Sequence, residues 1–167
     1  MSRRRRVRER TARYGDRVSG PVYFDSSALL KLYLPEPGSD ELDRAVEGRD
    51  DLLASDLTVT EIVSALARRV RDGALSSEQA RVVHRSLVAG LDAGPYGHVD
   101  LDRGIHRDAE RLLLDRRDVG LRAADALHLA LAISARAGTI ATFDRRLGAA
   151  ARAVGLGTYP VSHPEEA

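Results

Sequence analysis

The stretch Pro21-Val-Tyr-Phe-Asp25, followed directly by Ser26-Ser-Ala-Leu-Leu-Lys-Leu-Tyr-Leu34, has the pattern of a short buried strand that leads into a helix. Its consecutive apolar residues are typical of a strand that is covered on both faces in a parallel sheet. The stretch Thr139-Ile-Ala-Thr-Phe143, between Gly138 and Asp144, indicates another strand of this kind. Both predicted strands end at an aspartate, at the point where a helix is expected to begin.

Outward from these two stretches, strand and helix patterns alternate along the chain. Further strands are expected at 52–56, 98–101 and around 158–160, and helices at 26–34, 39–46, 57–71, 76–91, 105–115, 122–136 and 145–154. This alternation predicts an α/β fold whose central parallel sheet carries helices on both faces. In such folds ligands bind beyond the carboxyl ends of the strands, where the helices begin.

The length and composition indicate one globular domain. The chain has 167 residues, of which 43% are hydrophobic and 31% are charged. Its longest unbroken apolar run is Leu129 to Ile133, whereas a membrane-spanning helix needs about 20 apolar residues. The lack of cysteine excludes disulfides and thiolate metal sites. We therefore expect a cytoplasmic protein with a single domain over residues 20–162 and a short tail over 163–167.

Positive charge is concentrated at the N-terminus. Residues 1–19 carry eight arginines against Glu9 and Asp16, a net charge of +6, although the formal charge of the whole chain is only +1. The rest of the chain is therefore mildly acidic. Repulsion among Arg3 to Arg6 predicts a disordered arm over residues 1–19. Such an arm can bind nucleic-acid phosphates, and it can equally be an inert leader.

Four acidic residues stand where the predicted fold places a ligand site. Asp25 and Asp144 end strands, Glu61 lies in the first turns of a helix, and Asp125 interrupts an apolar helix. Each has a structural explanation: the two strand-end aspartates as helix N-caps, and Glu61 as the partner of Thr58 in a capping box. Asp125 is harder to explain in this way, because an unpaired carboxylate in an apolar helix is costly. The expected convergence of all four on one sheet edge favours a functional site.

Carboxylates that converge in this way repel one another. Two charges roughly 4 Å apart interact by about 4 kcal/mol at an effective dielectric constant of about 20. Such a cluster must either take up protons or bind a cation. Oxygen ligands without cysteine favour Mg²⁺ or Mn²⁺. A cation of this kind lowers the pKa of a bound water and neutralises charge on an attacked phosphate.

At these acids the sequence resembles a known family. Val22-Tyr-Phe-Asp-Ser-Ser-Ala-Leu-Leu-Lys-Leu-Tyr33 is similar to the opening motif of PIN-domain nucleases, specifically the VapC toxins of type II toxin–antitoxin pairs. Ser55-Asp-Leu-Thr-Val-Thr-Glu-Ile62, Ala124-Asp-Ala-Leu-His-Leu-Ala130 and Ala141-Thr-Phe-Asp-Arg-Arg-Leu147 match the later motifs in the same order. The resemblance covers about residues 21–160.

The resemblance implies a three-layer α/β/α sandwich of the PIN type and Mg²⁺- or Mn²⁺-dependent cleavage of RNA. In this family a metal-activated water attacks the phosphodiester and leaves 5′-phosphate and 3′-hydroxyl ends, with one or two metal ions at the site. Glu61 would bind the metal directly or through a water. The residues that match the catalytic, metal-binding acids are Asp25, Glu61, Asp125 and Asp144, and those that match the smaller polar positions are Ser27 and Thr142.

The resemblance also implies partners. A free toxin would harm its host, so a small VapB-type antitoxin is expected to cover the acidic site. Toxins of this family form homodimers, for which the helices predicted at 39–46 and 57–71 could supply an apolar surface. No contact with a membrane is expected. Arg145 and Arg146 follow Asp144 directly and are candidate contacts for RNA phosphates.

Two other classes of protein with an aspartate after the first strand need residues that this chain lacks. An aspartyl phosphatase would need a second acid two residues after Asp25, where Ser27 stands; a phospho-accepting receiver domain would need a lysine after a late strand, but the only lysine is Lys31. His128, three residues after Asp125, suits either a general base or a histidine that packs beside the site. Two alternatives stay open: a PIN fold that binds a partner without cleaving anything, and a nuclease that acts on DNA.

Overall fold

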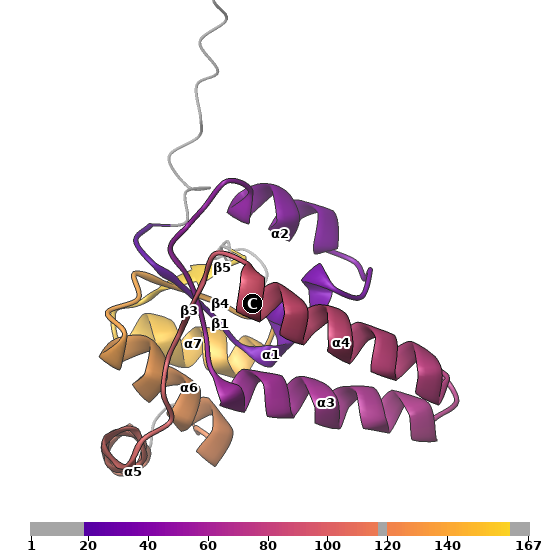
Figure 1. Ribbon diagram of the computed structural model, residues 1–167. Helices are drawn as coiled ribbons and strands as arrows, with labels where there is room; N and C mark the ends of the chain where they lie inside the picture. The colour runs from indigo at the N-terminus through magenta and orange to yellow at the C-terminus, as the bar shows by residue number, and fades with distance from the viewer. Residues whose placement is uncertain (1–18, 117–119, 161–167) are drawn as a thin grey trace, which may run out of the picture.

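A parallel sheet of five strands runs through the middle of the molecule, and helices cover both of its faces (Figure 1). The computed structural model describes residues 19–116 and 120–160. The strands are β1 (Val22–Phe24), β2 (Leu52–Ala54), β3 (Tyr96–His98), β4 (Thr139–Ala141) and β5 (Gly157–Tyr159), and their order in the sheet is β3-β2-β1-β4-β5. The expected α/β class, with a central parallel sheet in a three-layer α/β/α sandwich, is confirmed.

The helices divide between the two faces of the sheet. One layer contains α1 (Ser26–Leu29), the 3₁₀ turn η1 (Leu30–Leu32), α2 (Ser39–Val46), α3 (Asp56–Arg71) and α4 (Ser77–Ala93), and the other contains α5 (Arg103–Asp115), α6 (Ala123–Ser134) and α7 (Arg145–Ala153). In Figure 1, α3 and α4 form a long hairpin that extends beyond the sheet.

Alternating side chains of the central strands build the two cores. Val22 and Phe24 point into the core beneath α1 to α4, whereas Tyr23 points into the core beneath α5 to α7. On β4, Ile140 and Ala141 divide in the same way, and all five side chains are fully buried. Burying a large apolar side chain contributes about 1.5–3 kcal/mol, so the central strands are fixed from both sides.

The edge strand β3 lies two residues earlier than expected. The sequence predicted a strand at 98–101, but Ala54 pairs with His98 and the backbone N–H of Val99 donates the last ladder bond to the Ala54 carbonyl. Beyond this point the chain turns toward α5, which Asp102 caps by accepting from the N–H of Ile105. The apolar residues that follow His98 therefore lead into a helix instead of continuing the sheet.

The order of the strands places a crevice between β1 and β4. From β1 the chain proceeds outward to β2 and β3, and then it returns to β4 on the other side of β1. After β1 it enters α1 in one helical layer, whereas after β4 it enters α7 in the other layer. Ligands of open α/β sheets bind where the strand order reverses in this way. Asp25 and Asp144 stand at this position, directly after β1 and β4.

Two of the sequence expectations concern the chain ends. Residues 1–18, which make up nearly all of the predicted arginine arm, and the expected tail at 163–167 lie outside the described residues. Ser19 is described, and its backbone N–H donates to Thr139 Oγ1 at 3.2 Å. In return, that hydroxyl donates to the Ser19 carbonyl at 2.9 Å, so the chain is attached to β4 just before β1 begins.

Within the described ranges, no helix combines the length and apolar character needed to cross a bilayer.

The packing of α6 gives a test of this architecture. Leu131 is fully buried, whereas Ile133 on the same helix is 44% exposed. Leu131→Ala should lower the free energy of unfolding by about 2–5 kcal/mol, because it leaves a cavity in the core beneath α5 to α7. Ile133→Ala should change it by about 0.5 kcal/mol or less. Urea unfolding measures both values, and equal losses would contradict the orientation of α6.

Candidate active site

The four predicted acids line one cavity of about 490 Å³. It lies where the chain leaves β1 and β4, and α3 and the beginning of α6 form its walls. The expected convergence of the acids on one edge of the sheet is thus found. The residues that line the cavity are Asp25, Ser26, Ser27, Glu61, Ser64, Ala65, Arg68, Arg71, Arg122, Ala124, Asp125, His128, Asp144 and Leu147.

Asp25 is the most deeply buried of the acids, with only 4% of its surface exposed. It is the N-cap of α1, and its Oδ1 accepts from the backbone N–H of Ala28 at 2.9 Å. The Ser27 hydroxyl donates to the same oxygen at 2.8 Å. The Thr142 hydroxyl donates to the other oxygen, Oδ2, at 2.6 Å. Both oxygens of a buried carboxylate are therefore engaged by hydrogen-bond donors.

Ser27 and Thr142 do more than hold Asp25. The Ser27 hydroxyl accepts from the backbone N–H of Phe143 at 2.8 Å, and the Thr142 hydroxyl accepts from the N–H of Asp144 at 3.0 Å. Each hydroxyl therefore links the Asp25 carboxylate to the chain just beyond β4. The two bridges fix the position of the Asp144 backbone relative to Asp25, independently of the side chain of Phe143.

Burial raises the pKa of the Asp25 carboxyl above its ordinary value. The hydrogen bonds from Thr142, Ala28 and Ser27 oppose this shift, as does the nearby His128, but the loss of hydration is the largest effect. In the absence of a cation, a negative charge on Asp25 is therefore unfavourable.

Glu61 is held by partners from two other helices. Its Oε2 accepts from the Ser26 hydroxyl at 2.8 Å and lies 2.8 Å from Nε2 of His128. The hydrogen bond from His128 is the main reason that the pKa of Glu61 lies below its ordinary value. Glu61 is therefore ionised at neutral pH. Its hydrogen bonds join α3 to α1 and to α6.

His128 begins a chain of hydrogen bonds that runs into the core. Its side chain is only 3% exposed, and its Nδ1 lies 2.9 Å from the Tyr23 hydroxyl, which in turn lies 2.9 Å from Oγ of Ser55. Burial raises the pKa of Tyr23 to about 12, so this hydroxyl keeps its proton. Both ring nitrogens of His128 are thus engaged within the protein. This is the arrangement of a histidine that positions Glu61, and it leaves neither nitrogen directed at a substrate.

Asp125 and Asp144 stand at the N-termini of helices. Asp144 caps α7, and its Oδ1 accepts from the N–H groups of Arg146 and Leu147 at 2.7 and 3.1 Å. Asp125 lies in the first turn of α6, where its Oδ2 accepts from the N–H of Arg122 at 2.9 Å. Unpaired N–H groups and the helix dipole favour negative charge at both places. This explains how an acid is accommodated in the apolar sequence around Asp125.

The structural explanation offered for Glu61 does not hold. Thr58 does not cap α3 together with Glu61; the N-cap is Ser55, whose hydroxyl accepts from the N–H of Thr58 at 3.4 Å. The Thr58 hydroxyl donates instead to the Phe24 carbonyl at 3.0 Å. Glu61 is thus one turn farther into the helix than a capping role requires, and it is free to face the cavity.

The donor set suits a hard divalent cation. Unlike Asp25, each of the other three acids has one oxygen that accepts no hydrogen bond from a described residue. These oxygens are Glu61 Oε1, Asp125 Oδ1 and Asp144 Oδ2. Within the described part of the chain, however, no three acidic or histidine side chains form a ready-made metal cage. An open set of this kind suits Mg²⁺, which keeps several waters and binds through one or two carboxylates.

The structure adds three basic residues that the sequence did not single out. Arg68, Arg71 and Arg122 line the cavity together with the acids. Arg145 and Arg146 form the start of α7 and are not among the lining residues, so their contact with RNA stays a prediction. Arg68 and Arg71 could have been found from the sequence, because their helical spacing from Glu61 places them on the same face of the predicted helix.

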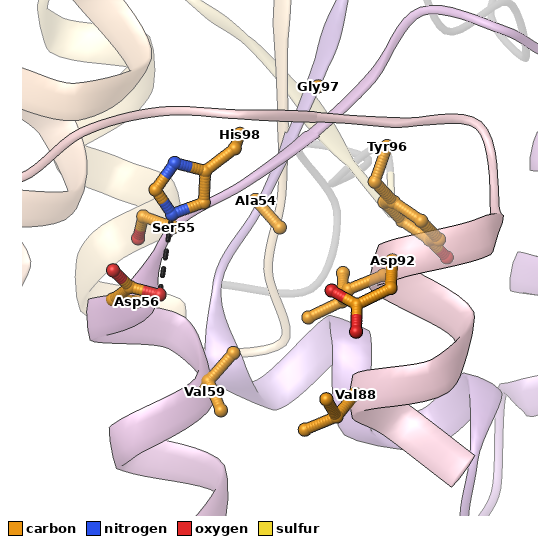
Figure 2. Close-up of a pocket in the computed structure, with 10 residues that line it drawn as sticks. Ala54, Ser55, Asp56, Val59, Val88, Asp92, Tyr96, Gly97 and His98 are labelled. Atoms are coloured by element: carbon orange, nitrogen blue, oxygen red, sulfur yellow. Dashed lines mark ion pairs between the residues drawn. The ribbon is translucent and has the colours of Figure 1, made fainter.

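A second hollow, of about 250 Å³, lies between β3 and the α3–α4 hairpin (Figure 2). In Figure 2 the imidazole of His98 points to Asp56, and their closest atoms are 3.3 Å apart. Val59 on α3 and Val88 on α4 add apolar surface to the hollow. None of the four acids lines this hollow, and its histidine already has a carboxylate partner.

Comparison with known proteins finds related sequences over most of the chain. The PIN domain family matches residues 22–153. Ribonuclease VapC45 of Mycobacterium tuberculosis is 34% identical over 141 residues, which cover 83% of this chain and 94% of the relative. Ribonuclease VapC3 of Pyrobaculum aerophilum is 31% identical over 129 residues, which cover 75% of this chain and 91% of the relative.

A solved structure also has the same fold. The crystal structure of VapC20 from Mycobacterium tuberculosis, a Sarcin-Ricin loop cleaving toxin, matches with a TM-score of 0.63 at 14% sequence identity. The match covers 77% of this chain and 94% of VapC20. The parallel α/β/α sandwich described above is the fold of a PIN domain. The chain belongs to the PIN-domain family and, within it, to the VapC-type ribonucleases.

The raised pKa of Asp25 predicts an effect on stability. The folded protein holds the proton of Asp25 more tightly than the unfolded chain does. The contribution of this proton to the stability of the folded state is therefore fully present below about pH 4. It is lost as the pH rises through the pKa of the folded state. In chelator at neutral pH, Asp25→Asn should therefore raise the melting temperature by a few degrees. The difference from the unsubstituted protein should shrink as the pH falls toward 4.

Asp144→Asn is the matched control. This residue is exposed, and asparagine caps helices as well as aspartate does, so the melting temperature should change less than in Asp25→Asn. Differential scanning calorimetry between pH 4 and pH 8 compares the variants. If Asp25→Asn melts below the unsubstituted protein at neutral pH, burial of the charge is not the dominant effect.

Proposed function

We propose that this protein is a divalent-metal-dependent endoribonuclease and the toxin of a toxin–antitoxin pair. The observation that carries the proposal is the gathering of Asp25, Glu61, Asp125 and Asp144 around a single cavity in a chain of the VapC type. Their oxygen ligands suit Mg²⁺ or Mn²⁺.

Each acid has a distinct part in the proposed site. Asp25, fixed from both sides by Ser27 and Thr142, is the central ligand for the cation, and the charge of the cation would offset the cost of its burial. Asp125 and Asp144 hold their positions through backbone N–H groups and offer one oxygen each toward the cavity. Glu61, oriented by His128 and Ser26, would act directly or through a bound water.

The cation, when bound, lowers the pKa of a coordinated water and neutralises charge on the scissile phosphate. The protein's own contribution is to hold four carboxylates together without a cation and to orient them. Helix N-termini, the hydroxyls of Ser27 and Thr142, and the imidazole of His128 achieve this. No side chain is required to become a covalent nucleophile.

The relatives support a proposal for the substrate and the partners of the enzyme. The relatives at 31–34% identity are named ribonucleases, which favours RNA over DNA as the substrate. The presence of all four acids favours an enzyme over a PIN fold that only binds. We propose that the protein acts in the cytoplasm as a homodimer, and that a VapB-type antitoxin neutralises it by covering the acidic cavity. The domain would span residues 20–162.

Cleavage of single-stranded RNA in Mg²⁺ or Mn²⁺ tests the proposal. Asp25→Ala and Asp125→Ala should each lower the rate by about 100-fold or more, because they remove charges that organise the transition state. Chelator should abolish activity, and addition of Mn²⁺ should restore it.

The control is Glu110→Gln on α5. Glu110 is exposed, pairs with Arg107 and does not line the cavity, so its loss should leave cleavage unchanged. Single-stranded DNA of the same sequence should be cleaved more slowly than RNA. Full activity of both aspartate variants, or full activity in chelator, would refute the assignment.

A further inference from the structure

The cavity that holds the acids also carries positive charge. Arg68 and Arg71 of α3 and Arg122 at the N-cap of α6 line the cavity and are exposed. None of the three forms an ion pair with a described residue. By contrast, Arg69, the neighbour of Arg68 in the chain, pairs with Glu36. The cavity arginines are therefore available to an external anion.

The spacing along α3 sets the geometry of this charge. Glu61, Ser64, Arg68 and Arg71 recur at intervals of three and four residues, which places them on one face of the helix. At about 1.5 Å per residue, Arg68 lies about 10 Å and Arg71 about 15 Å along the helix axis from Glu61. A basic stripe thus leads away from the acids along α3.

Arg122 lies on another wall of the cavity. It directly precedes α6, and its backbone N–H donates to Oδ2 of Asp125. Guanidinium groups therefore line the acidic cavity from two elements, α3 and the start of α6. A guanidinium stays charged at all physiological pH values and binds phosphate through paired hydrogen bonds.

This arrangement matches the charge pattern of an RNA strand. If the scissile phosphate lies among the acids, the phosphates that follow it along the strand would pass Arg68 and Arg71. We infer that Arg68, Arg71 and Arg122 form a phosphate-binding track that carries the RNA strand across the acids and along α3. The inference rests on the proposed ribonuclease function and adds the path of the substrate to it.

The track accounts for how a mildly acidic cavity binds a polyanion. The scissile phosphate would lie among the carboxylates, where a cation is needed, and the flanking phosphates would lie against arginines. Contacts of this kind position the strand and carry no sequence information. Selection among RNA sequences must therefore come from other residues.

Binding measurements on a cleavage-deficient background test the track. The full chain carrying Asp25→Asn is titrated into a labelled single-stranded RNA of about 12 nucleotides, at salt concentrations from about 50 to 200 mM. Three further variants each add one substitution to this background: Arg68→Gln, Arg71→Gln or Arg122→Gln. Each should flatten the log–log slope of the binding constant against salt concentration by about 0.7. At 0.1 M salt each loss corresponds to about fivefold weaker binding.

Arg107→Gln is the matched control for the loss of one positive charge. Arg107 is exposed, pairs with Glu110 and lies outside the cavity, so the salt slope should stay that of the background protein. The effect of Arg71→Gln should also shrink with a dinucleotide, which is too short to reach from the acids to Arg71. Any contribution from residues 1–18 is shared by all variants and cancels in the comparison.

Two results would overturn the track. Unchanged salt slopes in all three variants would show that the strand takes another path. Lower melting temperatures with unchanged slopes would show that the arginines only offset repulsion among the acids. Failure of the ribonuclease proposal is seen separately, because the unsubstituted protein would then leave RNA uncleaved in Mn²⁺.

Discussion

The burial of one carboxylate between the ends of β1 and β4 is the constraint on which the site depends. Asp25 receives its hydrogen bonds from Ala28 in α1, Ser27 in α1 and Thr142 after β4, so it links the two central strands at the point where strand order reverses. The same hydroxyls hold the backbone of Phe143 and Asp144. A buried charge in this place is unfavourable by itself, and a cation among the acids would remove this penalty.

Helix ends explain how like charges can be gathered around Asp25. Three of the four acids accept hydrogen bonds from the N–H groups of α1, α6 and α7, where the helix dipole favours negative charge. Glu61 does not lie at a helix N-terminus, and the imidazole of His128 stabilises its negative charge instead. The chain from His128 through Tyr23 to Ser55 connects the orientation of Glu61 to the packing of the core. The fold therefore prepares the site before any ligand arrives.

Local patterns were sufficient for much of this arrangement. The apolar run Val22–Phe24 and the stretch Thr139–Ala141 predicted the buried central strands, and Asp25 and Asp144 stood at recognisable strand ends. The edge strand Tyr96–His98 was misplaced because a half-exposed strand has no continuous apolar run. Arg68 and Arg122 were missed because their meeting at one cavity depends on how α3 and α6 pack. The pairing of His128 with Tyr23 and Glu61 is likewise set by tertiary packing, across more than 60 positions of sequence in each case.

The central claim is that the four carboxylates form one cation site organised by Asp25. Crystals grown with Mn²⁺ and measured for the anomalous scattering of manganese test this claim most directly. A manganese peak inside the cavity, bonded to Asp25 and to at least one of Asp125 and Asp144, and absent from Asp25→Asn crystals, is the result expected. A peak that excludes Asp25, in a protein that still cleaves RNA, would contradict the account.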